Sequence, residues 1–332
     1  MQKWIMLMML VALQGCSSND QVNAFDDSLY SGKPVDSLTA NEAPKTEKEA
    51  ITRGDKALAN KKMDLALYEY IRSLEFDDLE YADKTLITIG DIHQARGNVP
   101  LAEKSYLRAV EENPNNVTAL ENLGVLYSRN GNLPDGQVYF YRAINADQIR
   151  LKQNEPFARH KESITVEQVE ALKLDPQSPL HAYIGLGILA DVNQEGELAQ
   201  EYYKKALAID PFSTLAKLNL GYSYYMQGND KQALFYTKQV VALQPQNKRA
   251  TNNLALIYIR QGQVTNALNV FMRVMPDYEA LNNVGYLLML NQHQEESVPY
   301  FKRAIDKNPS YYPLANDNLS RALSEIRAKN PT

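Results

Sequence analysis

Small side chains recur at a fixed interval through most of this 332-residue chain, and this repetition restricts the possible folds more than any other feature of the sequence. The interval is 34 residues within two runs and 30 residues before the last member. The series is Gly90, Gly124, Gly187, Gly221, Ala255 and Gly285. A period of this length is typical of architectures that stack one supersecondary unit many times.

Other positions of the repeat follow at constant distances. Twelve residues on comes a second small residue: Ala102, Gly136, Ala199, Ala233, Ala267 and Ser297. Four residues later stands an aromatic residue in all copies but one: Tyr106, Phe140, Tyr203, Thr237, Phe271 and Phe301. A further small or β-branched residue then precedes a proline in four copies: Pro114, Pro211, Pro245 and Pro309. A weaker copy comes earlier in the chain: Gly54, Ala66, Tyr70 and Ser73.

This spacing predicts pairs of antiparallel helices. Two helices approach closely only where both carry small residues, and the two small positions of each copy supply such a crossing. We expect the aromatic residue to fill the gap between one hairpin and the next. Glycines stand at the predicted turns, where a left-handed backbone is needed: Gly97, Gly131, Gly228 and Gly262. The prolines should end the second helix of a pair.

The pattern resembles the tetratricopeptide repeat (TPR) over roughly residues 47–311. The resemblance implies an all-α fold, a TPR superhelix or α-solenoid of about seven helix-turn-helix repeats. The copies begin near Glu47, Asp83, Val117, Leu180, Thr214, Lys248 and Tyr278. Residues 312–332 hold an amphipathic segment, about Pro313 to Ala328, followed by a short tail. We expect that segment to be the capping helix that such arrays require.

Two places depart from the repeat. Residues 148–176 form an insertion between the N-terminal repeats, 47–147, and the C-terminal repeats, 177–311. The insertion contains Pro156, and we expect a short helix that starts at Thr165. The sixth copy is about four residues short at its end, in the stretch Val274-Met275-Pro276-Asp277. This shortening should tilt the seventh copy against the sixth.

The first residues are typical of a bacterial lipoprotein signal peptide, residues 1–15. Lys3 supplies one positive charge, and the apolar run from Trp4 to Leu13 is too short to span a bilayer as a helix. Leu13-Gln14-Gly15-Cys16 looks like a lipobox, which implies lipidation of Cys16 by acyl chains such as palmitate. Ser17 after the cysteine implies the outer membrane, with the protein facing the periplasm. Alternatively, Cys16 is a thiol near a conventional cleavage site.

Between the lipobox and the repeats the chain is polar and lacks a helical or strand period. Residues 16–46 therefore consist of the lipidated cysteine and a predicted disordered tether.

Composition excludes several classes of function. The net charge of -5 gives no reason to expect nucleic-acid binding. The four histidines are scattered and Cys16 is the only cysteine, so we expect no metal site. Gly185-Leu186-Gly187-Ile188-Leu189-Ala190 spells a dinucleotide fingerprint, but it falls inside a predicted helix and not after a strand. We expect neither a cofactor nor enzymatic activity.

An asparagine series carries the binding hypothesis. Its members occupy the same place in the first helix of their copies: Asn122, Asn219, Asn253, Asn283 and Asn318. In TPR arrays the first helices line a concave groove. An amide could pair there with the N–H and C=O of an extended peptide, largely regardless of its sequence. Tyr222, Tyr225 and Tyr286 would add side-chain contacts. The alternative is that these asparagines only support the fold.

A lipobox followed by TPRs is similar to the TadD-type lipoproteins of tight-adherence (Flp) pilus assembly, and to the related type IV pilus pilotins. The stretch from Pro276 to Tyr286 carries this resemblance. It implies protein partners from a secretin or pilus-assembly apparatus, with the membrane reached through the N-terminal lipid. The other hypothesis is an envelope lipoprotein adaptor that recruits peptidoglycan hydrolases or proteases. The sequence does not set the oligomeric state.

Overall fold

The computed structural model describes residues 42–153, 157, 164–308 and 310–329. These residues form sixteen α-helices and no strand, which confirms the all-α prediction. The chain divides into two compact units, Met1–Asn193 and Gln194–Thr332. The division falls inside the fourth predicted repeat, and the insertion belongs to the first unit.

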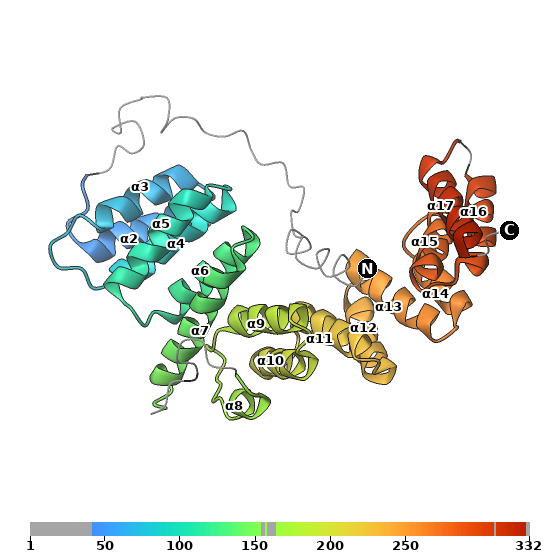
Figure 1. Ribbon diagram of the computed structural model, residues 1–332. Coiled ribbons are helices and arrows are strands. Elements are labelled where there is room, and N and C mark those ends of the chain that lie inside the picture. Colours follow the sequence, from blue (N-terminus) through green and yellow to red (C-terminus); the bar gives the residue numbers. More distant parts are fainter. Residues whose placement is uncertain (1–41, 154–156, 158–163, 309, 330–332) are drawn as a thin grey trace. The chain divides into compact units, whose positions relative to one another are not determined.

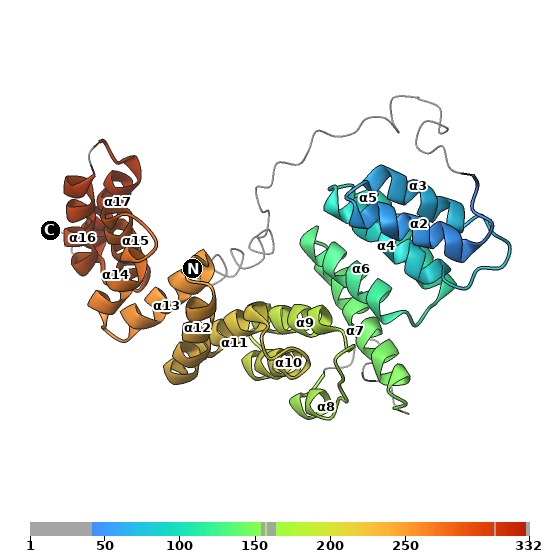
Figure 2. The same ribbon diagram turned by 180° about the vertical axis from the view of Figure 1, so that it is seen from behind.

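The first unit stacks three helical hairpins, which are followed by the short helix α8 and by α9 (Figures 1 and 2). Its helices are α2 (Glu47–Ala59), α3 (Met63–Ser73), α4 (Ala82–Ala95), α5 (Val99–Glu112), α6 (Val117–Arg129), α7 (Leu133–Arg150), α8 (Val166–Glu170) and α9 (Leu180–Val192). Each odd-numbered helix from α3 to α7 packs against the helix before it, and α9 packs against both α6 and α7. The helices α2, α4, α6 and α9 are therefore the first helices of their copies.

The second unit repeats this arrangement and ends on one extra helix (Figure 1). Its helices are α10 (Gly196–Ile209), α11 (Thr214–Met226), α12 (Asp230–Leu243), α13 (Lys248–Arg260), α14 (Val264–Met272), α15 (Asp277–Leu290), α16 (Gln294–Lys307) and α17 (Pro313–Lys329). Helix α17 packs against α15 and α16, as expected of a capping helix. Helix α14 has 9 residues where α12 and α16 have 14, which confirms the predicted shortening of the sixth copy.

Side-chain caps start seven of the described helices, and glycines with a left-handed backbone follow four of them. The side chain of Asn116 accepts a hydrogen bond from the backbone N–H of Ala119, and this satisfies a donor that the first turn of α6 leaves free. Similar caps are made by Thr46, Asn132, Thr165, Ser213, Asn229 and Asn247. The four predicted turn glycines have positive φ, from 71° at Gly262 to 83° at Gly131. The prediction of a left-handed turn at these residues is confirmed.

The aromatic residue of a repeat lies directly on the small residue of its own first helix. A Cβ added to Gly124 would stand 2.4 Å from the ring of Phe140, and one added to Gly90 would stand 2.4 Å from the ring of Tyr106. Phe140 also touches the next first helix, because a Cβ at Gly185 would stand 2.3 Å from the same ring. The Phe140 ring thus fills the predicted gap between successive hairpins. It also fills the space where the two helices of its own hairpin cross.

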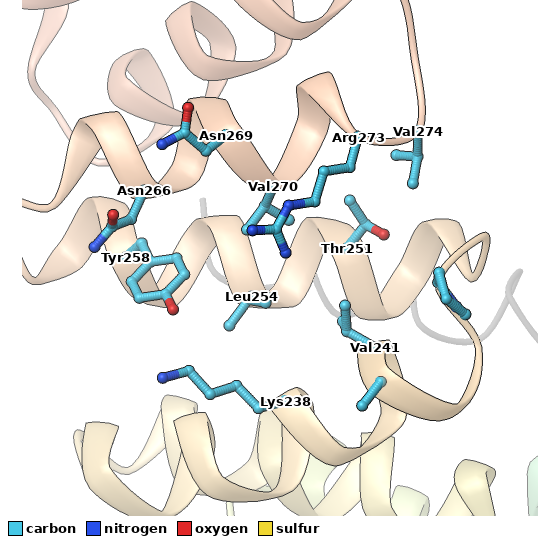
Figure 3. Close-up of a pocket in the computed structure, with 12 residues that line it drawn as sticks. Lys238, Val241, Thr251, Leu254, Tyr258, Asn266, Asn269, Val270, Arg273 and Val274 are labelled. Carbon is cyan, nitrogen blue, oxygen red and sulfur yellow. The ribbon is translucent and has the colours of Figure 1, made fainter.

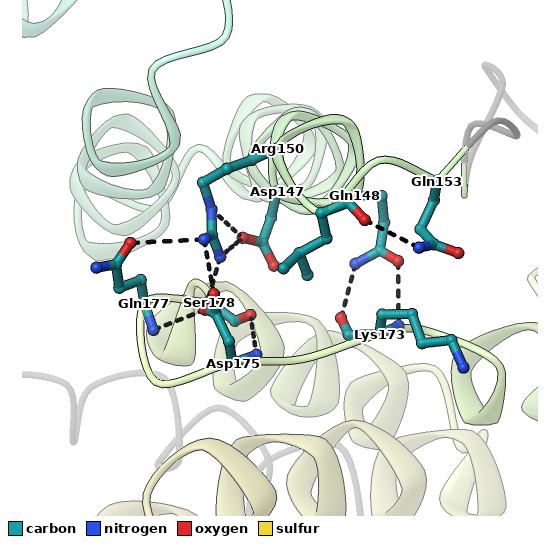
Figure 4. A network of polar contacts seen from close by, with 9 residues as sticks. Asp147, Gln148, Arg150, Gln153, Lys173, Asp175, Gln177 and Ser178 are labelled. Atoms are coloured by element: carbon teal, nitrogen blue, oxygen red, sulfur yellow. Dashed lines mark hydrogen bonds and ion pairs between the residues drawn. The ribbon is translucent and has the colours of Figure 1, made fainter.

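The described part of the insertion is held against α7 by polar contacts (Figure 4). The guanidinium of Arg150 bonds the carboxylates of Asp147 at 2.5 Å and of Asp175 at 2.6 Å. Phe157 is buried, and its backbone N–H donates to the side-chain oxygen of Asn145 at 2.7 Å. Helix α8 begins after Thr165, where the sequence predicts a short helix. The insertion therefore packs on the helix that it extends.

Several predictions concern residues that the structure does not describe. The signal peptide, Cys16 and nearly all of the tether fall in residues 1–41, and Pro156 and Pro309 also lie outside the described residues. Among the helices that are described, none has the length and apolar character needed to cross a bilayer.

Candidate functional site

The asparagine series lies where successive first helices meet. In the second unit these helices are α11, α13, α15 and the cap α17. Asn219 on α11 contacts Arg249 on α13, and Asn318 on α17 donates to the side-chain oxygen of Asn282 on α15 at 3.0 Å. We call the surface that these first helices share, with the amides Asn219, Asn253, Asn283 and Asn318, the amide face.

Asn219 is the most enclosed member of the amide face. Its side-chain oxygen accepts from the guanidinium of Arg249 at 3.3 Å, and only 1% of the residue is exposed. Its amide nitrogen is buried and has no hydrogen-bond acceptor among the described residues. A partner therefore cannot reach Asn219 as it stands in the structure, although the sequence predicts a direct contact there. The residue instead positions Arg249.

Arg249 brings a positive charge to the amide face. No carboxylate of the described residues lies within ion-pair distance of its guanidinium. Burial lowers the pKa of the group, because desolvation disfavours the charged form. Guanidinium groups nevertheless stay protonated in proteins. The face therefore offers a fixed cation to a peptide carbonyl or carboxylate.

The remaining amides are more accessible. Asn253 is half-buried, and no hydrogen bond to its side chain is found in the described part of the chain. The amide of Asn283 donates to the sulfur of Met275 at 3.2 Å, which is a weak interaction. Asn318 is half-buried and keeps part of its amide capacity after bonding Asn282. These three residues can pair with a peptide backbone.

Two of the three predicted tyrosines meet at one end of the face. The rings of Tyr222 and Tyr225 are tilted, with centroids 6.0 Å apart. The guanidinium of Arg260 lies 3.6 Å from the centroid of Tyr225 and also pairs with Asp230. Tyr222 is only 7% exposed, so Tyr225 is the more accessible ring. Burial raises the pKa of the Tyr225 hydroxyl, which keeps it a neutral donor.

The other predicted residues lie elsewhere. Tyr286 packs against the cluster of Met289, Phe301 and Ala322 near the cap. Asn122 belongs to the first unit, where its amide donates to the carboxylate of Asp91 at 3.0 Å. The structure thus groups the C-terminal amides in the second unit and gives Asn122 a partner within its own unit.

The two arginines of the face, Arg249 and Arg260, were not among the residues predicted from the sequence. Arg249 stands four residues before Asn253 on α13, and Arg260 stands seven residues after it. Both intervals place side chains on one side of an α-helix. That helical spacing was a usable signal. The residue directly before the asparagine, by contrast, is Leu218, Asn252 or Asn282 in the copies of this unit and Asp317 in the cap, and none of these side chains is cationic.

Groups of histidine, cysteine, aspartate or glutamate that could hold a metal ion are absent from the described residues. The chemistry of the amide face is hydrogen bonding and ring contact. It suits the recognition of a polypeptide segment.

Comparison with known proteins agrees with this architecture. Three stretches of the chain match family models described as Tetratricopeptide repeat, at residues 105–138, 184–237 and 278–311. No curated protein matches the chain in sequence.

Two solved structures have a similar fold. One is a tetratricopeptide repeat protein from Parabacteroides merdae, 17% identical, which covers 84% of this chain and 100% of its own with a TM-score of 0.52. The other is PilW, described as a widely conserved type IV pilus biogenesis factor. PilW is 18% identical, the match covers 74% of this chain and 100% of PilW, and the TM-score is 0.50. TPR proteins are typically scaffolds that bind other proteins and have no enzymatic activity. The chain therefore contains tetratricopeptide repeats, and its described residues have the fold of a TPR array.

Proposed function

We propose that this protein is an outer-membrane lipoprotein whose amide face binds a segment of a partner protein during assembly of a pilus or secretin apparatus. The observation that carries the binding role is that the amide face combines half-buried amides with the guanidinium of Arg249, which has no ion-pair partner among the described residues. Asn253 and Asn283 provide donors and acceptors for a peptide backbone, and Arg249 provides a cation for a carbonyl or carboxylate.

The lipid anchor is supported by the sequence Leu13-Gln14-Gly15-Cys16 and by the short apolar run before it. The choice of apparatus is supported by the TadD-like stretch from Pro276 to Tyr286. PilW, whose printed description is a type IV pilus biogenesis factor, also has this fold. A tight-adherence pilus, a type IV pilus or its secretin is therefore the assembly in which we place the protein.

Partner capture tests the binding role. The full chain, carrying a purification tag, is used to recover proteins from detergent-solubilised envelopes. Recovery of secretin or pilus-assembly components is the expected result. The double variant Asn253→Ala/Asn283→Ala should lose them. The variant Asn115→Ala, which changes an exposed loop asparagine, should not. Equal recovery by the double variant would remove the amide face from the mechanism, and recovery of wall hydrolases instead would favour the adaptor role.

Lipid attachment is tested separately. Growth with radiolabelled palmitate should label the wild-type protein, and the label should sediment with outer membranes on a density gradient. The variant Cys16→Ser should carry no label and should leave the membrane fraction. Labelling that persists in this variant would disprove the anchor at Cys16.

A further inference from the structure

A cavity of about 500 Å³ lies in the second unit, between the helices α12, α13 and α14 (Figure 3). Its floor is apolar and is formed chiefly by Val241, Leu254 and Val270. The volume is in the range of ordinary ligand pockets. The cavity is separate from the amide face in its lining residues: neither the amides of that face nor its tyrosines belong to the lining.

Two departures from the repeat create the cavity. The fourth residue of a copy is a large buried side chain in four other copies: Leu86, Leu120, Tyr183 and Leu281. The sixth copy has Thr251 at this place, which leaves space on the floor. In addition, α14 ends at Met272 after only 9 residues, so Arg273 and Val274 stand at the edge of the cavity.

The rim of the cavity is positively charged. Lys238 on α12 and Arg273 at the end of α14 reach into the opening from opposite sides (Figure 3). The lining contains no carboxylate. The ammonium of Lys238 lies 5.7 Å from the centroid of Tyr258, and neither Lys238 nor Arg273 has an ion-pair partner in the described part of the chain. Two such cations at the rim of one cavity favour an anionic occupant.

The surface continues along α12. A second hollow shares Lys238 and is lined also by Lys231 and Phe235. Phe235 is 57% exposed, which is a large exposure for an aromatic ring. Lys231, Phe235 and Lys238 recur at intervals of four and three residues, so they share one side of the helix. The whole surface therefore alternates apolar and cationic groups.

We propose that this cavity is a second binding site, which takes an acidic segment of a partner protein that carries bulky apolar side chains. One apolar side chain enters the cavity above Thr251 and Leu254, and carboxylates of the segment pair with Lys238 and Arg273. The exposed amides Asn266 and Asn269 pair with its backbone. Further along, Phe235 and Lys231 receive the next apolar and acidic residues.

A polypeptide fits this surface better than a membrane does. Recognition of anionic lipid usually takes a cluster of about four to eight basic residues. Here two cations, Lys238 and Arg273, line an apolar hollow that is flanked by amides, and Lys231 lines the neighbouring hollow. The cavity is deep enough to take an inserted side chain, and the amides at its rim can bond the backbone of the same polypeptide segment.

Isothermal titration calorimetry with the full chain tests the proposal. The probe is a short synthetic peptide in which Asp and Glu alternate with Phe and Leu. Two matched peptides serve as controls, one with Asn and Gln for the acids and one with Ala for the apolar residues. Vesicles of phosphatidylethanolamine and phosphatidylglycerol form the last arm. We expect binding of the first peptide only, and we expect added salt to weaken it.

Variants locate the site. Lys238→Glu/Arg273→Glu should weaken binding of the acidic peptide by about tenfold or more. Lys302→Glu reverses an exposed charge on α16 and should leave binding unchanged. Thr251→Leu keeps every charge but fills the floor with the residue found at Leu120 and Leu281, and it should also weaken binding. Circular dichroism checks that each variant is folded.

Four results would overturn the proposal. These are no heat of binding with the wild-type chain, equal affinity in the Lys238→Glu/Arg273→Glu variant, equal binding of the amide peptide, and vesicle binding that depends on the same two residues. The variant Asn253→Ala/Asn283→Ala should bind the acidic peptide normally. The proposal for the cavity and the proposal for the amide face can therefore be disproved independently of each other.

Discussion

The side-chain amide of Gln148 bonds both backbone groups of Lys173, 25 residues away. Its nitrogen donates to the carbonyl oxygen at 2.9 Å, and its oxygen accepts from the N–H at 3.1 Å. Gln148 is only 3% exposed, so these two hydrogen bonds are buried. The side-chain amide bonds the backbone of Lys173 as a neighbouring peptide group would. The contact holds the end of the insertion on α7 (Figure 4).

Replacing Gln148 should therefore release the insertion without unfolding the repeats. Gln148→Leu removes both hydrogen bonds and should cost about 1 kcal/mol of local stability. Hydrogen exchange of the Lys173 amide should become faster, while amides in α4 and α5 keep their protection. Gln148→Glu retains an acceptor for that N–H, so it should preserve more of the protection. Unchanged exchange in Gln148→Leu would show that the pair does not hold the insertion.

The ion pair between Arg150 and Asp175 should make the stability of the first unit depend on pH in acid. The hydrogen bond from Arg150 lowers the pKa of Asp175 from 3.8 to about 2. Because the folded value lies below the unfolded one, the stabilisation is complete above about pH 4 and is lost as the pH falls toward about 2. Thermal unfolding measured across this range checks the direction.

The matched variants are Asp175→Asn and Arg150→Gln. Each should unfold at a lower temperature than the wild type at neutral pH, and the difference should disappear near the acid end of the range. A difference that stays constant down to the lowest pH would contradict the assignment to this carboxylate.

Gly124 should tolerate no larger side chain while Phe140 is present. A Cβ would stand 2.4 Å from the ring, and the opposite side of the ring lies on Gly185, so the ring has little room to move. Gly124→Ala should lower the stability by about 1–3 kcal/mol, the usual cost of overpacking. Urea unfolding followed by circular dichroism provides the measurement.

Gly131→Ala is the control for this substitution. Gly131 has φ of +83° and open space around it, so an alanine there meets only backbone strain of about 1 kcal/mol. The double variant Gly124→Ala/Phe140→Leu should recover part of the loss, because the smaller side chain makes room for the methyl group. Equal costs at Gly124 and Gly131, with no recovery, would show that close packing is not the reason for the glycine.

The repeat spacing was sufficient to predict the fold because steric packing restricts the size of the side chain at each recurring position of a copy. The glycine at the helix crossing, the aromatic ring on it and the left-handed turn all impose local requirements that recur in most copies. Gly124, Phe140 and Gly131 illustrate the three requirements. The site was less predictable. Whether Asn219 is exposed depends on Arg249 of the next copy, and the cavity depends on what Thr251 and a short α14 leave empty. Such features depend on contacts between neighbouring copies, which the repeat period alone does not predict.

Asn219 and Asn253 occupy the same place in adjacent copies, but we expect their replacement to change the stability by different amounts. Asn219→Ala removes the hydrogen-bond partner of the partly buried Arg249, so it should lower the stability by about 1 kcal/mol. Asn253→Ala removes a half-buried amide with no hydrogen bond among the described residues, and it should change the stability by less than about 0.5 kcal/mol. Thermal unfolding of the two variants separates these expectations, and partner capture by Asn253→Ala should nevertheless fall. If Asn253→Ala destabilises the chain as much as Asn219→Ala and captures its partner normally, the asparagine series supports the fold alone, because every amide would then be used within the array.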